Sequence, residues 1–194
     1  MARLHPDTLA ALAPDVRTPG YDRSALGCGI VHLGIGAFHR AHQALYTEEA
    51  IEAAGGDWGI IGVSLRSSSV AAQLRPQDCL YSLLSEDGSG HRLRVLGAVR
   101  DVLVAPQEIQ RVVAAIAAPT TAVVTLTITE KGYYLASDGV SLAVDDAAIA
   151  ADLRQPQRPA TAIGLLARGL RERMESCGAP ITLLSCDNLA GNSR

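Results

Sequence analysis

The stretch IVHLGIGAFHRAH, residues 30 to 42, places two glycines between an apolar run and a segment rich in histidine and arginine. Its first residues are β-branched and apolar, which is typical of a buried strand. Gly34 and Gly36 then permit a tight turn and a close approach of the backbone to a ligand. A strand, a Gly-x-Gly turn and a helix form the context in which the pyrophosphate of a dinucleotide binds. The third glycine of that pattern is replaced here by His39.

The turn alone leaves two interpretations open. A Gly-x-Gly step is common in strand–helix turns that bind nothing, but its position after the first strand of an alternating chain favours a dinucleotide. His39, Arg40 and His42 place basic groups at a helix start, where they oppose the helix dipole by up to about 1 kcal/mol. That cost favours an anion nearby. We expect no metal site, because no set of zinc ligands with the usual spacing accompanies this histidine pair.

The rest of the chain alternates strand-like and helix-like segments. Short runs rich in Val, Ile and Thr predict strands, and apolar residues at helical spacing predict helices between them. The sequence EDGSGH carries Asp-Gly and Ser-Gly steps that predict a β-hairpin. We therefore expect an α/β fold, a Rossmann-like doubly wound and mainly parallel sheet with a β-hairpin insertion. The expected strands are 29–33, 58–65, 122–128 and 180–186, the hairpin strands 79–85 and 93–99, and the helices 40–54, 106–118, 145–153 and 162–174.

The composition argues against several classes of protein. The 194 residues carry a net charge of −3 and only one Phe and one Trp, so nucleic-acid binding has neither a basic surface nor an aromatic platform. No apolar stretch approaches the roughly 20 residues of a membrane span, and the first residues do not resemble a signal peptide. The four cysteines lie apart without CxxC spacing, which favours reduced thiols and a cytoplasmic location.

Four stretches of this sequence resemble one family. They are GIVHLGIGAFHRAHQALYTEEA (29–50), WGIIGVSLRS (58–67), TLTITEKGYY (125–134) and LLSCDNLAGN (183–192). In this order and spacing they are similar to the signatures of the polyol-specific long-chain dehydrogenases, the family of mannitol dehydrogenase and fructuronate reductase. The resemblance implies that residues 30–42 form a cofactor turn in which His occupies the third glycine position.

The same resemblance implies a fold and a chemistry. Residues 1–194 correspond to the dinucleotide-binding, Rossmann-type domain, and the helical domain that follows it in the family is missing from this chain. The family transfers a hydride between NAD(P) and a sugar alcohol or a hexuronate. Its general base, a lysine, belongs to the missing domain. We therefore expect the chain alone to show no dehydrogenase turnover, with the small-molecule substrate and the missing domain as its partners.

Individual residues match the family's motifs. Asn188 matches an asparagine whose amide holds the substrate oxygen as alkoxide character develops, although a loop asparagine that satisfies local backbone is the alternative. Thr129 and Glu130 follow the third strand of the alternating pattern and, by resemblance, border the nicotinamide; a strand-ending turn with Gly132 is the alternative. The cofactor turn itself comprises Gly34, Ile35, Gly36, Ala37 and Phe38.

The loop after the second strand bears on the choice between NAD and NADP. NAD-preferring members of the family often carry an acidic residue shortly after its Leu-Arg, where the acid binds the ribose 2′-hydroxyl and repels a 2′-phosphate. Here Arg66 is followed by three serines, ending at Ser69, and the next acidic residue is Asp78. The expected cofactor is NAD, with NADP possible, and our hypothesis is a relaxed or NADP-leaning preference.

Two other classes of function compete with an oxidoreductase. A catalytically inactive dinucleotide-binding or regulatory module predicts cofactor binding without activity, even when the missing domain is supplied. An α/β domain kept for protein interaction predicts no binding of any dinucleotide. The four ordered signatures argue against the second alternative.

Overall fold

Five parallel strands form the central sheet, in the order β5-β2-β1-β6-β7. The structure is a computed structural model that describes residues 3–88, 90–189 and 192. The order reverses between β1, the central strand, and β6, its parallel neighbour. The strands are β1 (Ile30–Leu33), β2 (Ile60–Ser64), β5 (Val99–Val104), β6 (Val123–Leu126) and β7 (Thr182–Ser185).

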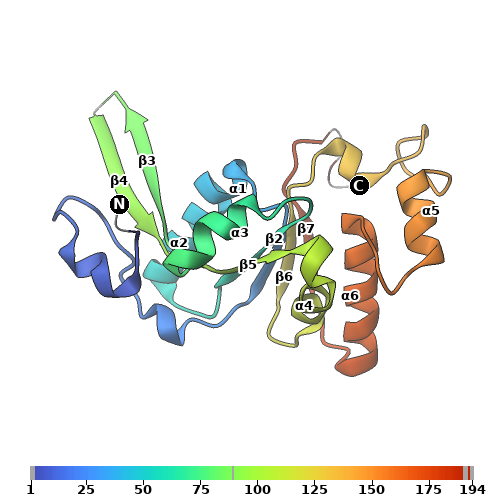
Figure 1. Cartoon of the computed structure of the whole chain (residues 1–194), viewed down its shortest axis with the longest axis horizontal. Helices are drawn as coiled ribbons and strands as arrows, with labels where there is room; N and C mark the ends of the chain where they lie inside the picture. The colour runs from blue at the N-terminus through green and yellow to red at the C-terminus, as the bar shows by residue number, and fades with distance from the viewer. Residues whose placement is uncertain (1–2, 89, 190–191, 193–194) are drawn as a thin grey trace.

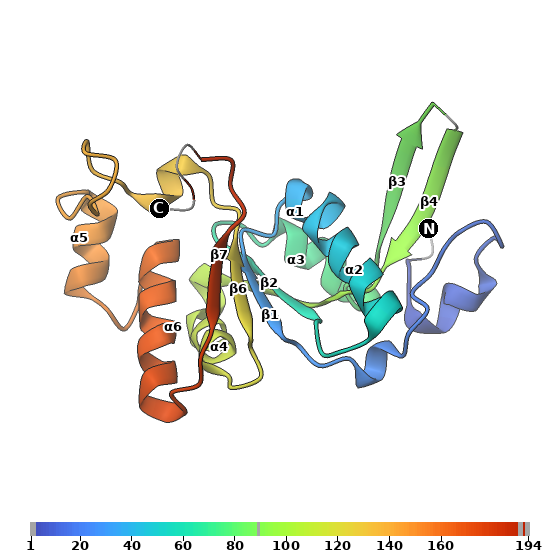
Figure 2. The same cartoon turned by 180° about the vertical axis from the view of Figure 1, so that it is seen from behind.

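Helices cover both faces of this sheet, as Figures 1 and 2 show from opposite sides. One face packs against α2 and α3, and the other against α4 and α6. The outermost helix, α5, lies against α6. The helices are α1 (Ala37–Ala41), α2 (Gln43–Ala54), α3 (Ser69–Leu74), α4 (Ala105–Ala117), α5 (Ala147–Arg154) and α6 (Ala162–Ser176).

Strand alternation builds two separate cores. Ile30 points into the core beneath α2 and α3, whereas Val31 points into the core beneath α4 and α6. All four residues of β1 are buried, which is expected of a parallel strand covered on both faces. The prediction of a Rossmann-like doubly wound α/β sheet is therefore confirmed.

The predicted hairpin is present with different bounds. It consists of β3 (Tyr81–Asp87) and β4 (Gly90–Leu96), paired antiparallel, and it projects away from the sheet (Figures 1 and 2). Val99, which we expected at the end of the hairpin, instead begins β5 at the edge of the main sheet. The prediction was wrong there because the break at Gly97-Ala98 is too short to separate two apolar runs in the sequence.

Two features of the helices also differ from expectation. The helix predicted over 40–54 begins at Ala37 and is interrupted at His42, whose φ of −124° and ψ of −82° are not helical. The serine-rich segment after β2, for which no helix was predicted, forms α3. Short 3₁₀ turns complete the chain at Pro6–Ala11, Arg23–Ala25, Arg75–Gln77 and Glu130–Tyr133.

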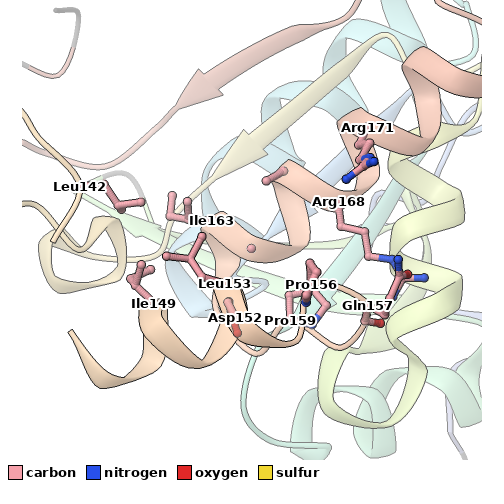
Figure 3. A pocket seen from close by; sticks show the side chains of 12 residues that line it. Leu142, Ile149, Asp152, Leu153, Pro156, Gln157, Pro159, Ile163, Arg168 and Arg171 are labelled. Carbon is pink, nitrogen blue, oxygen red and sulfur yellow. The ribbon is translucent and has the colours of Figure 1, made fainter. Parts of the chain in front are cut away.

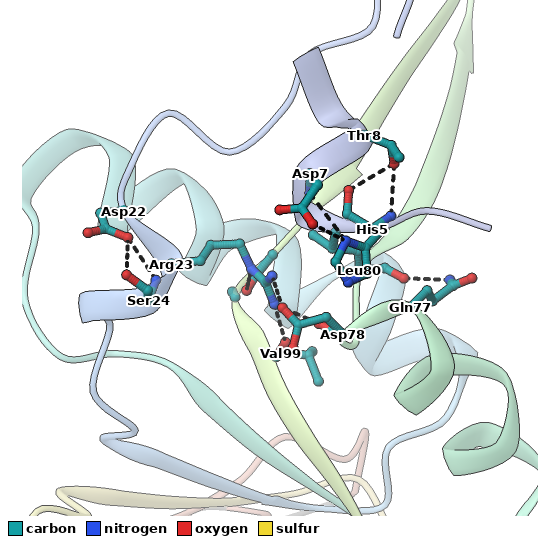
Figure 4. A network of polar contacts seen from close by, with 12 residues as sticks. His5, Asp7, Thr8, Asp22, Arg23, Ser24, Gln77, Asp78, Leu80 and Val99 are labelled. Carbon is teal, nitrogen blue, oxygen red and sulfur yellow. Dashed lines mark hydrogen bonds and ion pairs between the residues drawn. The ribbon is translucent and has the colours of Figure 1, made fainter. Parts of the chain in front are cut away.

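A buried arginine fastens the first residues of the chain to the base of the hairpin (Figure 4). The Arg23 guanidinium donates to the Asp78 carboxylate at 2.6 Å, to the Asp78 carbonyl at 2.8 Å and to the Gly97 carbonyl at 3.0 Å. This charge can be buried because a carboxylate and backbone carbonyls accept hydrogen bonds from its N–H groups. Residues before β1 are thereby part of the fold. No helix among the described residues is both long and apolar enough to cross a membrane.

Candidate functional site

A cleft opens at the carboxyl ends of β1, β2 and β6, where the strand order of the sheet reverses. Open α/β sheets bind their ligands at this place. The cleft has a volume of about 320 Å³. Its lining comprises Gly34, Ile35, Gly36, Ser64, Leu65, Arg66, Ser67, Ile128, Thr129, Gly132, Tyr134, Ala160, Thr161 and Ala162.

The glycine turn forms one wall of the cleft. Gly34 has a φ of +103°, and a side chain there would clash with the carbonyl oxygen of Thr127 on the neighbouring β6 connection. A Cβ on Gly36, by contrast, would meet only the Gly34 carbonyl oxygen, at 3.8 Å. The space over Gly36 is therefore open to a ligand that approaches the backbone closely, which is what a dinucleotide pyrophosphate requires.

A polar cluster lies beneath this turn. The rings of His32 and His39, both fully buried, stack with their centroids 3.5 Å apart and an interplanar angle of 14°. Burial lowers the pKa of both imidazoles: that of His39 falls to about 4, and that of His32, which also faces the His39 ring, falls to about 2. Both rings are consequently neutral near pH 7.

Asp187 connects the loop after β7 with the loop after β6. Its carboxylate accepts the backbone N–H groups of Ile128 at 2.9 Å and Thr129 at 3.0 Å, and the hydroxyl of Tyr133 at 2.8 Å. Thr129 adopts a φ of +65° and a ψ of 160°, a conformation that costs a non-glycine residue about 1–3 kcal/mol. Burial and the nearby carboxylate raise the pKa of Tyr133 to about 12, which keeps its hydroxyl a donor. Asp187 thus holds Thr129 at the edge of the cleft.

The start of α6 supplies another wall. The Thr161 hydroxyl caps this helix by accepting the Gly164 N–H at 2.9 Å. The Asp152 carboxylate in turn accepts the Ala160 N–H at 2.8 Å and the Thr161 hydroxyl at 2.6 Å. A threonine before the apolar run of α6 is a helix-capping signal in the sequence, but nothing in the sequence indicates that this helix start faces the glycine turn.

The loop after β2 brings Arg66 and its serines to the cleft. Arg66 is exposed, and within the part of the chain that the structure describes its guanidinium has no hydrogen-bond or ion-pair partner. Ser67 lies between Ser64, whose hydroxyl donates to its carbonyl at 2.6 Å, and Ser69, whose hydroxyl is 2.9 Å from its own. A free cation beside hydroxyls suits an anionic oxygen.

A separate pocket between α5 and α6 has a different character (Figure 3). Its volume is about 250 Å³, and much of its lining is apolar, including Leu142, Ile149, Leu153 and Ile163. Asp152 reaches its wall, but that carboxylate is already engaged in holding the start of α6. The chemistry-bearing groups converge on the sheet edge instead, so we take the cleft at the glycine turn as the functional site. Among the described residues, no group of three or more His, Cys, Asp or Glu is placed to hold a metal.

Comparison with known proteins identifies the fold that builds this cleft. A family model described as the mannitol dehydrogenase Rossmann domain matches residues 28–194. The chain belongs to this family. The match to a mannitol dehydrogenase Rossmann domain agrees with the resemblance noted in the four sequence stretches.

Relatives of this mannitol dehydrogenase domain are considerably longer. A polyol:NADP oxidoreductase of Gluconobacter oxydans is 41% identical over 191 residues, which cover 96% of this chain and 39% of that protein. A mannitol 2-dehydrogenase of Cereibacter sphaeroides is 40% identical over 180 residues, which cover 91% of this chain and 38% of that protein. The structure of Pseudomonas fluorescens mannitol 2-dehydrogenase, a ternary complex with NAD and D-mannitol, matches with a TM-score of 0.90 at 36% identity, covering 97% of this chain and 39% of that one. The chain therefore spans less than half the length of these proteins.

Only some of the residues singled out in the sequence line the cleft of this mannitol dehydrogenase domain. Gly34, Ile35, Gly36, Arg66 and Thr129 do so. The residues outside the lining are Ala37, Phe38, Ser69, Glu130 and Asn188.

Three of the residues outside the lining have different surroundings. The Phe38 ring is 60% exposed and stacks on His42, with centroids 5.1 Å apart. Ser69 reaches the cleft through its contact with Ser67. Asn188 is exposed, one residue beyond the Asp187 carboxylate that binds the β6 loop. Asp187 was not singled out in the sequence, although it lies inside the SCDN stretch and binds the loop after β6.

Proposed function

We propose that residues 1–194 form the cofactor-binding lobe of an NAD(P)-dependent oxidoreductase that acts on a sugar alcohol or a hexuronate. The observation that carries the proposal is the glycine turn at the switch point of the sheet. There Gly34 adopts a positive φ against Thr127, and the space over Gly36 is open. A bound dinucleotide supplies the hydride acceptor, while the protein supplies binding and orientation. The relatives named above, polyol and mannitol oxidoreductases by name, support this reading of the cleft.

The site residues have distinct proposed roles. The backbone from Gly34 through Ile35, Gly36 and Ala37 to Phe38 would hold the pyrophosphate, and Thr129 with Glu130 would border the nicotinamide. The Asn188 amide would donate to the substrate oxygen as it gains negative charge; an amide N–H can do this without ionising. The connection from Asp187 to Thr129 N supports the last two roles, because it ties the Asn188 loop to the β6 loop.

Arg66 and the serines bear on cofactor choice, and we propose that they accept a 2′-phosphate. Arg66 is exposed at the cleft and Ser67 lines it, with Ser69 in contact with Ser67. An acidic side chain at this loop would repel a phosphate, and the sequence from Leu65 to Val70 contains none. NAD remains the cofactor expected of the family, so the proposal is a relaxed or NADP-leaning preference.

Separate titrations of NADH and NADPH into the purified chain test these proposals. We expect saturable binding, and we expect Arg66→Ala to weaken NADPH binding by about tenfold while leaving NADH affinity unchanged, the loss of roughly one charge-assisted hydrogen bond. Arg154→Ala, which removes an exposed arginine at the end of α5, is the matched control. An equal loss for both nucleotides would contradict the role of Arg66. Failure of the folded chain to bind either nucleotide would contradict the cofactor lobe itself.

The remaining proposals concern the whole protein. We propose a cytoplasmic enzyme whose substrate walls and general base lie in the part of the relatives' length that this chain does not span, the helical domain implied by the family resemblance. Turnover of D-mannitol or D-mannonate should then be absent from the 194-residue chain and present when the chain is fused to the remaining region of the Gluconobacter oxydans relative. Binding without turnover in that fusion would instead favour the inactive dinucleotide-binding module.

A further inference from the structure

A continuous series of hydrogen bonds runs beneath the glycine turn, from α1 to the Gly34 carbonyl. His39 Nδ1 is 3.2 Å from Gln43 Oε1, and Gln43 Nε2 donates to the Thr125 hydroxyl at 3.1 Å. Thr125 Oγ1 is 2.7 Å from His32 Nδ1. On the far side of that ring, His32 Nε2 lies 2.9 Å from the Thr127 hydroxyl and 3.2 Å from the Gly34 carbonyl oxygen. Four elements, α1, α2, β1 and β6, therefore meet in one polar series.

The direction of each proton in this series follows from its ends. The Gly34 carbonyl oxygen can only accept a hydrogen bond, so His32 Nε2 carries the proton and His32 Nδ1 is unprotonated. The Thr125 hydroxyl then donates to His32 Nδ1 and accepts from the Gln43 amide. The Gln43 amide oxygen in turn requires His39 Nδ1 to carry a proton. Both rings are neutral but opposite in tautomer, Nε2–H for His32 and Nδ1–H for His39.

The series ends at the Gly34 carbonyl oxygen, whose direction decides whether the turn can accept an anion. The Gly34 carbonyl oxygen receives His32 Nε2–H, the Thr127 hydroxyl at 2.9 Å and the Gly36 N–H at 2.6 Å. These donors hold the oxygen toward the sheet. A carbonyl oxygen turned into the cleft would instead oppose a phosphate by charge repulsion.

His39 explains why this turn can dispense with its third glycine. The ring fills the space between the start of α1 and β1 by stacking on His32, and it is fully buried. Its Nε2 is buried and has no hydrogen-bond partner among the described residues, so packing and the Nδ1 bond alone hold it. Two stacked rings therefore occupy the space between helix and strand where a glycine would allow close packing.

We propose that His32, His39 and Gln43, joined through Thr125, are positioning residues that hold the Gly34 carbonyl away from the cleft and so prepare the turn for the pyrophosphate of a dinucleotide. This proposal rests on the proposed cofactor function. It makes a counterintuitive prediction: His39→Gly, which completes the Gly-x-Gly-x-x-Gly pattern, weakens dinucleotide binding. The expected loss is about tenfold, equivalent to one hydrogen bond.

Three variants separate positioning from mere packing, each assayed by NADH and NADPH titration. Thr125→Val breaks the series in β6 without touching the turn, and we expect the same roughly tenfold loss as for His39→Gly. His39→Asn places an amide N–H where Nδ1–H stood, and we expect it to restore most of the affinity although the ring stack is gone. His91→Asn, which alters an exposed histidine on the β3–β4 hairpin away from the cleft, is the matched control and should bind like the unaltered chain. Unchanged affinity in both Thr125→Val and His39→Gly would overturn the proposal.

Nitrogen-15 NMR of the imidazole rings tests the series independently of any ligand. We expect His32 in the Nε2–H form and His39 in the Nδ1–H form, with the His32 signals shifted in Thr125→Val. The reverse tautomers together with intact nucleotide binding would refute the series and leave the cofactor function standing. Absence of nucleotide binding by the unaltered chain together with the expected tautomers would refute the cofactor function, and with it the role we give to the series.

Discussion

The buried histidine pair makes the stability of this protein sensitive to mild acid. In the folded chain burial holds the pKa of His39 near 4, whereas an imidazole in an unfolded chain titrates at about 6.5. A group whose folded-state pKa is lowered binds its proton more readily in the unfolded chain. Its contribution to stability is therefore complete above about pH 6.5 and is lost as the pH falls toward the folded value.

The magnitude follows from the width of that window. Between about pH 7.5 and about pH 5, the unfolded imidazole gains its proton while folded His39 stays neutral, which lowers the free energy of unfolding by about 2 kcal/mol. Burial lowers the pKa of His32 still further, so His32 reduces the free energy of unfolding by about the same amount. Glu48 acts in the opposite direction, because burial raises its pKa and protonation then favours the folded chain.

Urea unfolding at several pH values, in the unaltered chain and in His39→Phe, isolates the His39 contribution. Phenylalanine keeps a ring against His32 and cannot titrate, whereas Glu48 is present in both chains and cancels. As the pH falls from 7.5 to 5, we expect the free energy of unfolding of the unaltered chain to drop by about 2 kcal/mol more than that of His39→Phe. His42→Phe, which removes an exposed imidazole, controls for the loss of one histidine. Parallel pH profiles for the unaltered chain and His39→Phe would refute the reasoning.

Three further predictions concern individual contacts. Gly34→Ala should lower the free energy of unfolding by about 3 kcal/mol in urea denaturation, since an alanine at a φ of +103° also clashes with a backbone carbonyl; a loss below about 1 kcal/mol would contradict this. Arg173→Met should lower the free energy of unfolding by about 3 kcal/mol, because the buried guanidinium donates to four backbone carbonyls. The exposed control Arg171→Met should lower it by less than about 0.5 kcal/mol, and equal Tm shifts for the two variants would contradict the role of these hydrogen bonds. Asp187→Asn should speed hydrogen exchange of the Thr129 amide by about tenfold as one strong acceptor is weakened, and an unchanged rate would show that the loop holds itself.

Much of the fold could be predicted because its signals are local. The β-branched runs around Ile30 and Val123 specify strands by composition, and the apolar spacing after Pro106 specifies α4. Strand β5 could not be separated from the hairpin, because only Gly97 and Ala98 divide two apolar runs that join different sheets. Which sheet an apolar strand joins depends on partners distant in the sequence.

Residues of the candidate site could be predicted only where the local backbone conformation restricts the choice of amino acid. Gly34 could be singled out because a positive φ leaves little choice of residue. Asp187 could not, because its carboxylate acts on Ile128 and Thr129, which lie 59 and 58 residues away in the sequence. The wall built by Thr161 at the start of α6 escaped notice for the same reason.

The alternation of strands and helices, the glycine turn and the family resemblance could all be read from the amino-acid sequence, because periodicity and backbone freedom are properties of neighbouring residues. The surroundings of the turn follow from the folded arrangement. The stacking of His39 on His32, the path of hydrogen bonds through Thr125 and the tie from Asp187 to Thr129 all join residues from different strands and helices. Such contacts exist only once the sheet has brought those elements together.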